Sequence, residues 1–188
     1  MSGVPPAPPR LHVTGASGCG VSTLGAALAT RLGAAHLDTD AFYWRPSDPP
    51  YQHSRPVPER LSLIEQAMTA PTSGWALSGS LCGWGDPLIP RFERVIFLST
   101  TTEVRLARLQ ARERARYGDA IAPGGPLEQQ HNDFMAFAIG YETGVFTGSL
   151  TGRHRALHEA WLAGLPCPVV RLDAALPTAV LVEAVVVG

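Results

Sequence analysis

The stretch Gly15-Ala16-Ser17-Gly18-Cys19-Gly20-Val21-Ser22-Thr23, named here the glycine loop, constrains the fold of this chain more than any other feature. A short β-rich run over 11–14 precedes it, and apolar residues recur at helical spacing over 24–32 behind it. A strand, a glycine-rich turn and a helix in direct succession gather backbone N–H groups and the positive end of a helix dipole around one anion. The loop therefore predicts a phosphate-binding site within an α/β fold.

One position departs from the usual pattern of such loops, which is Gly, four residues, Gly, Lys, then Ser or Thr. Val21 stands in place of the lysine, which normally reaches the β- and γ-phosphates of a nucleotide. Valine has neither charge nor donor, so loss of this contact should cost roughly 10²–10³ in rate. Two explanations stay open: another cation has taken over the lysine's role, or phosphoryl transfer has been lost while nucleotide binding remains.

The other positions of the glycine loop fit a nucleotide site. Gly15, Gly18 and Gly20 let the chain bend and approach a phosphate closely, and Ser22 offers a hydroxyl to Mg²⁺. The predicted nucleotide contacts are Gly15, Ser17, Gly18, Cys19, Gly20, Val21, Ser22 and Thr23.

Strand and helix patterns alternate along the rest of the chain. Strand-like runs over 34–37, 75–78, 94–98 and 167–172 join the first one, and helical patterns cover 59–68, 100–117, much of 127–162 and the stretch from 177. Thr100 with Glu103 predicts a capping box for the helix over 100–117, and breaks are expected near Gly144 and Gly148. The alternation predicts a three-layer α/β fold with a five-stranded parallel sheet. A length of 188 residues suits about one domain, expected over 11–188 after a flexible, proline-rich lead-in over 1–10.

Composition narrows the class of protein. Fifteen basic and 16 acidic residues give a formal net charge of -1, so no basic face for nucleic acid is expected. The three cysteines have neither metal-ligand nor disulfide spacing, which favours a reducing, cytoplasmic location. No apolar stretch approaches the ~18 residues that span a bilayer, so no membrane partner is expected. The oligomeric state stays open.

Two carboxylates, Asp38 and Asp40, follow the second strand-like run. The carboxyl edge of a parallel sheet is where ligands bind in open α/β folds. One aspartate can support Mg²⁺ while the other accepts a proton from a substrate hydroxyl. The alternative is a helix N-cap or turn pair, which Asp supplies routinely.

Residues 15–43 together resemble the small-molecule kinases of the gluconate and shikimate kinase group, which pair a phosphate loop with Asp-x-Asp on the next strand. The runs 36–46, 75–79 and 94–98 also resemble the adenylate-kinase-like P-loop proteins called topology modulation proteins. The resemblance spans most of 11–117. It implies a P-loop NTPase fold of the nucleoside-monophosphate-kinase type. It also implies ATP (or another NTP) as donor, Mg²⁺ held by Ser22 and Asp38, and contact of Asp40 with a hydroxylated acceptor.

Ser78 is a departure from the adenylate kinase relatives, which often carry an acidic residue at the end of the third strand. Shikimate kinases lack that acidic residue, so Ser78 favours the Asp-x-Asp group.

A row of arginines, Arg105, Arg108, Arg112 and Arg116, shares one face of the helix expected over 100–117. Arg105 and Arg108 are predicted to lie on a solvated face. Arg112 and Arg116 adjoin the region, about 112–135, that resembles a kinase lid. Either guanidinium could supply the charge that Val21 lacks. A solvated face is the alternative for these two as well.

The resemblance also locates an acceptor-binding insert at about 43–72 and a glycine-rich substrate turn after 75–78. The candidate acceptor contacts are Tyr43, Arg45, Arg55, Gly79 and Trp84. The alternatives are a structural proline-rich loop and a tryptophan packed beneath a loop. His154 and His158 share a helix face and are predicted to be a surface pair, because Arg155 stands where a zinc-protease helix needs Glu.

The predicted function is ATP-dependent transfer of a phosphoryl group to a hydroxyl of a small metabolite. The alternative is a catalytically impaired nucleotide-binding module, a sensor or partner protein, which Val21 and Ser78 favour. Slow NTP hydrolysis coupled to a conformational change is a third reading.

Overall fold

The computed structural model describes residues 9–187. Residues 1–8, most of the predicted lead-in over 1–10, lie outside them. Arg10 begins the first strand, and the Pro9 carbonyl accepts a hydrogen bond from the Trp75 amide at 2.7 Å. The lead-in prediction is therefore wrong for Pro9 and Arg10, because both pair with the sheet.

Five parallel strands form one sheet, as predicted, with the order β2-β3-β1-β4-β5. The strands are β1 (Arg10–Gly15), β2 (Ala35–Asp38), β3 (Trp75–Ser78), β4 (Arg94–Ser99) and β5 (Val169–Asp173). Val13 is in register with Ser78 of β3, and Gly15 with Leu98 of β4. Because β1 is the central strand, the loop that follows it opens between the carboxyl ends of β3 and β4.

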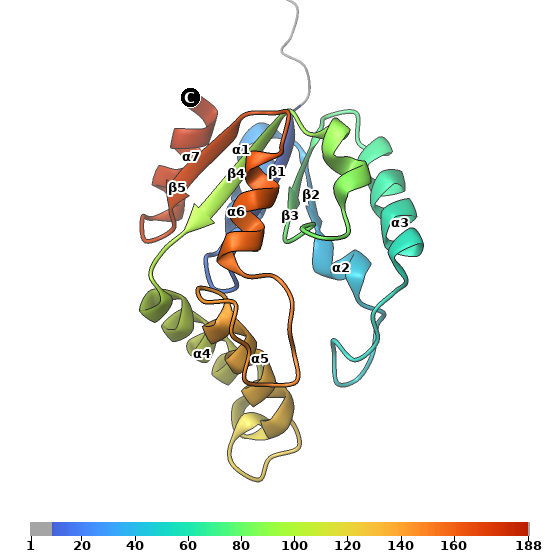
Figure 1. The fold of residues 1–188 in the computed structure, drawn as a ribbon. Helices are drawn as coiled ribbons and strands as arrows, with labels where there is room; N and C mark the ends of the chain where they lie inside the picture. Colours follow the sequence, from blue (N-terminus) through green and yellow to red (C-terminus); the bar gives the residue numbers. More distant parts are fainter. Residues whose placement is uncertain (1–8, 188) are drawn as a thin grey trace, which may run out of the picture.

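Helices cover both faces of the sheet and extend beyond its carboxyl edge (Figure 1). They are α1 (Val21–Leu32), α2 (Thr39–Tyr43), α3 (Val57–Thr69), α4 (Thr102–Tyr117), α5 (Glu128–Gly140), α6 (Arg155–Ala163) and α7 (Thr178–Val187), with two 3₁₀ turns, η1 (Asp86–Arg91) and η2 (Gly118–Ile121). Among the helices within residues 9–187, none is both long and apolar enough to cross a membrane. Helices α4 and α5 form an arm that projects below the strand ends (Figure 1).

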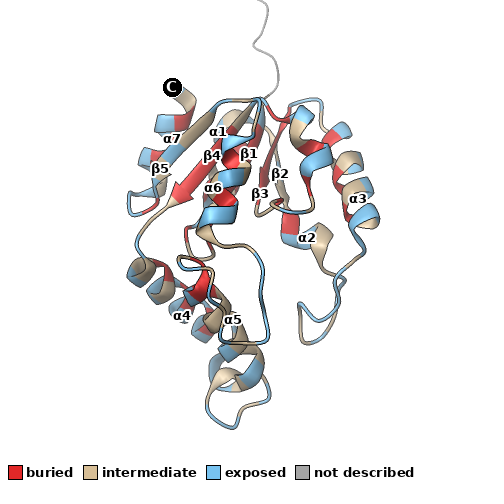
Figure 2. Ribbon diagram, viewed as in Figure 1, coloured by how far each residue is buried: buried red, intermediate tan, exposed pale blue. Residues whose placement is uncertain are grey.

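The core consists of two apolar layers, one on each face of the sheet. Successive residues of β4 alternate between them: Ile96 joins the layer beneath α1 and α7, and Phe97 the layer beneath α3 and α6. Within the sheet, the buried positions concentrate in β1, β3 and β4 (Figure 2). A strand buried on both faces needs a continuous apolar run, which explains the sequence of β4.

Helix boundaries follow local signals with two differences. Gly33 ends α1 in the left-handed conformation, at φ 65°, as its position after the apolar repeat predicts. The expected cap of α4 at Thr100 is one residue early, because the Thr101 hydroxyl accepts the Val104 amide at 3.4 Å. The helical stretch expected over 127–162 is broken by an irregular segment over 141–154, which contains both predicted breaks, Gly144 and Gly148.

Gly79, directly after β3, lets α2 approach the sheet. Its φ is 121°, and a Cβ there would lie 1.8 Å from the Thr39 hydroxyl oxygen. We expect Gly79→Ala to combine about 1–3 kcal/mol of backbone strain with a further 1–3 kcal/mol from displacing Thr39. Gly83→Ala is the matched control, since Gly83 has φ 86° but no atom within 4 Å of its Cβ position. Urea unfolding of the two variants separates clash from strain, and equal losses would contradict the packing argument.

Candidate functional site

The glycine loop joins β1 to α1. Gly18 and Gly20 have φ of 87° and 81°, and Gly20 is the N-cap of α1 with no side-chain cap. Within residues 9–187, no acceptor takes the N–H of Gly20, Val21 or Ser22, and the first turn of α1 holds no acidic residue. An uncapped helix start of this kind favours an anion.

Arg105 of α4 supports the glycine loop from beneath. Its side chain is fully buried, and Nη1 donates to the Ser17 carbonyl at 3.2 Å and the Ala138 carbonyl at 3.3 Å. Nη2 lies 3.4 Å from a carboxylate oxygen of Glu142. The prediction of a solvated Arg105 is wrong, because this face of α4 packs against the loop. A Cβ on Gly18 would lie 2.6 Å from the Arg105 carbonyl oxygen, so the backbones also approach closely.

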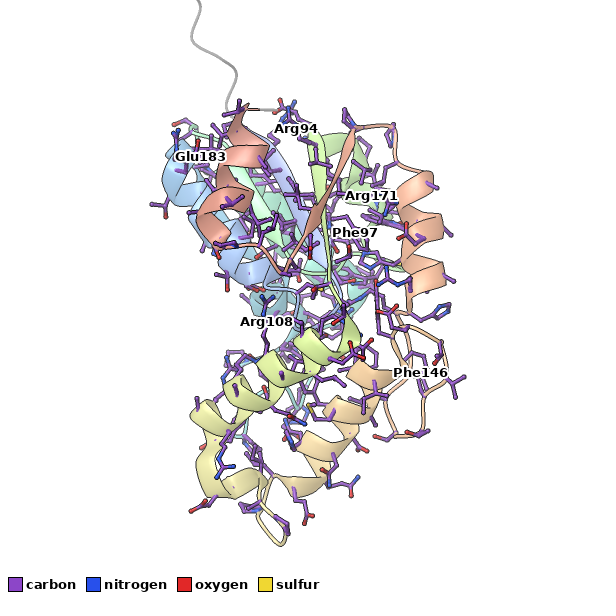
Figure 3. All side chains as sticks on the ribbon, turned by 90° about the vertical axis from the view of Figure 1, so that its left-hand side faces the viewer. Arg94, Phe97, Arg108, Phe146, Arg171 and Glu183 are labelled. Atoms are coloured by element: carbon purple, nitrogen blue, oxygen red, sulfur yellow. The ribbon has the colours of Figure 1, made fainter. Side chains whose placement is uncertain are left out.

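Arg108, one turn further along α4, is exposed as predicted. Its Nη1 donates to the Ala174 carbonyl after β5 at 2.9 Å, and its side chain points from α4 toward the sheet (Figure 3).

His158 lies beneath the strand that leads into the glycine loop. Its Nε2 shares a 3.1 Å hydrogen bond with the Thr14 hydroxyl, and its Nδ1 shares a 3.0 Å bond with the Tyr141 hydroxyl. The prediction of a surface pair is wrong, because α6 turns the fully buried His158 inward while His154 caps its first turn. Burial and nearby arginines lower the pKa of His158 to about 3, so the imidazole is neutral.

His12 of β1 is a second buried histidine. Its Nδ1 donates to the Leu77 carbonyl at 3.0 Å, and burial lowers its pKa to about 4. An unfolded histidine titrates near 6.5, so between pH 6.5 and about 4 the unfolded chain binds more protons than the folded one. As the pH is lowered through this window, we expect the free energy of unfolding to decrease. The decrease should be about 1.4 kcal/mol per pH unit for each of His12 and His158.

Urea titrations at pH values from 7.5 to 4.5 measure this dependence. His158→Gln should remove the contribution of one histidine from the slope. His53→Gln, at an exposed position, should leave the slope unchanged. A slope that does not respond to His158→Gln would contradict a neutral buried imidazole.

Asp38 and Asp40 lie together at the carboxyl end of β2. Asp38 caps α2, with Oδ1 accepting the Asp40 amide at 3.0 Å, so the capping alternative is observed for this residue. The side chain of Asp40 reaches solvent, although protein surrounds the rest of it. This enclosure and the charge of Asp38 raise the pKa of Asp40, while Arg153, Arg112 and Arg116 oppose the rise. A carboxyl with a raised pKa is a better proton acceptor near neutral pH.

The two arginines proposed for the lysine's role already have protein partners, one on the arm and one on the loop between α2 and α3. Arg112 donates to Glu113 at 2.9 Å, and Arg116 donates to the Tyr51 hydroxyl at 3.1 Å. Neither forms a hydrogen bond with the glycine loop within residues 9–187. Their catalytic role stays a prediction.

The loop between α2 and α3 contacts the arm. The Arg116–Tyr51 bond is one such contact. In addition, Gln52 donates to the side chain of Gln130 at 3.0 Å, and Gln130 donates to the Pro50 carbonyl at 3.2 Å. These three contacts join the predicted acceptor insert to the predicted lid region.

Arg45 and Arg55, two of the predicted acceptor contacts, are engaged by the protein. Arg45 pairs with Glu59 at 2.5 Å. Arg55 pairs with Glu59 at 3.3 Å and donates to the carbonyls of Ala41, Phe42 and Trp44. Both therefore fasten the end of α2 to the start of α3, and we leave them out of the site proposed below.

Tyr43 and Trp84 are brought together, with ring centroids 5.9 Å apart. The guanidinium of Arg60, a buried residue, lies 3.5 Å above the Tyr43 ring and 5.3 Å from the Trp84 ring. Sequence reasoning missed Arg60, since an arginine in the first turn of a helix gives no signal for burial.

Arg153, in the irregular segment before α6, is a further residue that sequence reasoning missed. Burial lowers its pKa, while Tyr141, Cys82, Asp40 and Cys19 oppose this change. Its charge therefore interacts with one residue of the glycine loop, Cys19, and with one of α2, Asp40. Its neighbour Gly152 was the available sign of an irregular backbone there, where helical periodicity predicted a helix.

Comparisons with known proteins extend this description. The chain matches no family model. It is 43% identical over 164 residues to the protein described as uncharacterized protein YqaC of Bacillus subtilis (strain 168), and the match covers 87% of this chain and 88% of that protein.

Two solved structures match this chain at 19% identity. A sugar kinase from Janibacter sp. HTCC2649 has a TM-score of 0.51, over 96% of this chain and 94% of that one. A gluconokinase from Sinorhizobium meliloti 1021 has a TM-score of 0.48, over 94% and 89%. The sheet order and the sugar kinase match give this protein the α/β fold of the P-loop kinases. The chain belongs to the family of YqaC.

Proposed function

We propose that this protein transfers the γ-phosphoryl group of a nucleoside triphosphate, expected to be ATP, to a hydroxyl of a small metabolite. The observation that carries the proposal is the uncapped start of α1 at the same sheet edge as an accessible aspartate with a raised pKa. The first feature suits an anionic donor, and the second suits an acceptor hydroxyl.

In this reaction the acceptor oxygen forms a bond to the γ-phosphorus as the bond from that phosphorus to the β–γ bridging oxygen breaks. The nucleoside diphosphate leaves with the electron pair of the broken bond. The acceptor proton passes to the carboxylate of Asp40. The amides of Gly20, Val21 and Ser22 bind phosphate oxygens, and the Tyr43–Trp84 pair offers an aromatic wall to the acceptor.

The residues present fit a magnesium ion that arrives with the nucleotide. Within residues 9–187, no group of three or more His, Cys, Asp or Glu could hold a metal by itself. Magnesium usually takes one or two protein ligands and completes its shell with phosphate oxygens and water. The Ser22 hydroxyl and the second carboxylate oxygen of Asp38, neither with a hydrogen-bond partner within that range, supply such ligands. The bound ion would neutralise charge on the transferring phosphates.

The second candidate is a nucleotide-binding module without transfer, which the valine in the glycine loop favours. The two candidates differ in one measurable product. We would incubate the protein with ATP, Mg²⁺ and a pool of polyols, sugar acids and nucleosides, and follow ADP by phosphorus NMR. ADP that depends on an acceptor supports the kinase. Tight ATP binding without turnover over hours would overturn it in favour of the binding module.

A further inference from the structure

We propose that Arg153 supplies the positive charge that the glycine loop lacks at Val21, by binding the terminal phosphates of the nucleotide. The inference deepens the proposed function and rests on it for the identity of the anion. It replaces the expectation that Arg112 or Arg116 does so.

Most basic side chains of this protein already have a partner. The chain contains no lysine, so all 15 basic residues are arginines. All but three of them have a hydrogen bond or ion pair to protein within residues 9–187. The three are Arg91, Arg114 and Arg153. Arg91 and Arg114 are exposed, whereas Arg153 is only partly exposed and its Nε is fully enclosed with no partner in the described chain.

The segment that carries Arg153 is held in place by a hydrogen bond and ion pairs. The Arg155 amide donates to the Tyr141 carbonyl at 2.7 Å, and the carboxylate of Glu142 pairs with both Arg155 and Arg105. Arg105 in turn holds the Ser17 carbonyl of the glycine loop. Arg155, which follows Arg153 by two positions, is thereby tied to the glycine loop.

The first turns of α6, which also follow Arg153 in the chain, are fastened as well. His158 is bonded to Thr14, the residue directly before the loop, and the Cys82 thiol lies 3.9 Å from the Leu157 carbonyl oxygen. Arg153 is therefore a short distance along the chain from contacts with both β1 and the turn after β3.

The charge of Arg153 affects the pKa values of several groups around it. The charge of Arg153 lowers the pKa of His158 and opposes the burial-induced rise in the pKa of Cys82, Tyr141 and Asp40. These groups come from four separate parts of the fold, and one of them, His158, is bonded to the residue directly before the glycine loop. An enclosed charge without a partner is costly, so the site is suited to an anion that arrives from solvent. A guanidinium binds phosphate through two parallel hydrogen bonds, which suits the phosphates that a loop lysine would contact.

Arg112 and Arg116 fit this role less well. Both are exposed, and each already has a partner on the arm or on the loop over 44–56. Their charges act on Asp40 less than that of Arg153 does. They are better suited to the acceptor side of the site.

The test measures binding of a non-hydrolysable ATP analogue with Mg²⁺ by calorimetry, with AMP as the comparison ligand. Arg153→Met keeps the aliphatic stem and should weaken binding of the triphosphate analogue by about 10–100-fold, with little effect on AMP. Arg91→Ala, at an exposed position in the hollow by β3 and the end of η1, is the control and should bind like the wild type. Val21→Lys in the Arg153→Met background should restore most of the lost affinity.

Thermal unfolding without nucleotide distinguishes this role from a merely structural one. Removing an enclosed charge without a partner should leave the Tm of Arg153→Met equal to that of the wild type or higher. A structural arginine would give a clear fall in Tm, which would overturn the inference.

The experiments distinguish a failure of the inference from a failure of the proposed function. If Arg153→Met binds the analogue as tightly as the wild type, the inference is wrong while the kinase proposal stands. If the wild type binds but never transfers, the kinase proposal is wrong while the role of Arg153 stands. A wild type that binds no triphosphate would overturn both.

Discussion

Replacing Asp40 by asparagine should reduce acceptor-dependent ADP formation by about 10²–10⁴-fold and leave nucleotide binding within about threefold. Asparagine has nearly the same shape but cannot accept the acceptor's proton. Asp38 caps α2, and its side chain accepts the backbone amide of Asp40. This backbone contact survives the substitution of the Asp40 side chain. Phosphorus NMR measures the rate, and calorimetry measures nucleotide binding.

The pH profile gives a sharper version of this prediction. Because the surrounding protein and Asp38 raise the pKa of Asp40, the acid limb of kcat/KM should lie above the pH at which an ordinary aspartate titrates. Asp38→Asn keeps an N-cap but removes the charge, so it should move this limb to lower pH. Glu65→Gln is the control. Glu65 lies on α3 and lines the same hollow as Arg91, so this substitution should leave the pH profile unchanged. An Asp40→Asn variant with wild-type turnover would exclude Asp40 as the base.

Replacing Arg105 by alanine should lower the free energy of unfolding by about 3–5 kcal/mol, or the Tm by about 10 °C. The substitution removes the donors to the Ser17 and Ala138 carbonyls and leaves a cavity beneath the glycine loop. Because the loop loses its support, nucleotide affinity should fall as well.

Arg108→Ala is the matched control on the same helix. Arg108 is exposed, and within residues 9–187 it donates only to the Ala174 carbonyl, so its loss should cost about 0.5–1.5 kcal/mol. If Arg105→Ala does not fold, Arg105→Lys keeps the charge without the planar fork and should give an intermediate loss. Equal stabilities of the two alanine variants would contradict the supporting role of Arg105.

The sequence predicted the sheet well because the strands are short runs rich in apolar residues, and most of them have glycine, proline or aspartate at their ends. Its failures have a common physical cause. Helical spacing identified which residues share a face of α4 or α6, but not which face turns inward. Arg105 and His158 were assigned to solvent because they are polar, although each is buried with hydrogen-bond partners.

The site was only partly predictable for a different reason. The glycine loop and the two aspartates carry their chemistry in local spacing. Arg153 belongs to an irregular segment, and its position depends on contacts of Tyr141 and Glu142, at the start of that segment, with α6. A single sequence contains no local signal for such a tertiary arrangement.

The contacts between the loop over 44–56 and the α4–α5 arm have a kinetic consequence. They are hydrogen bonds from an arginine or amide to uncharged acceptors, and none of the three is an ion pair. Each is worth only about 0.5–1.5 kcal/mol, so the two segments can separate on little thermal energy. Dissolved salt screens charge pairs and hardly affects such bonds. The rate of ligand entry and exit should therefore be nearly independent of ionic strength. The affinity for the phosphates can still change with ionic strength.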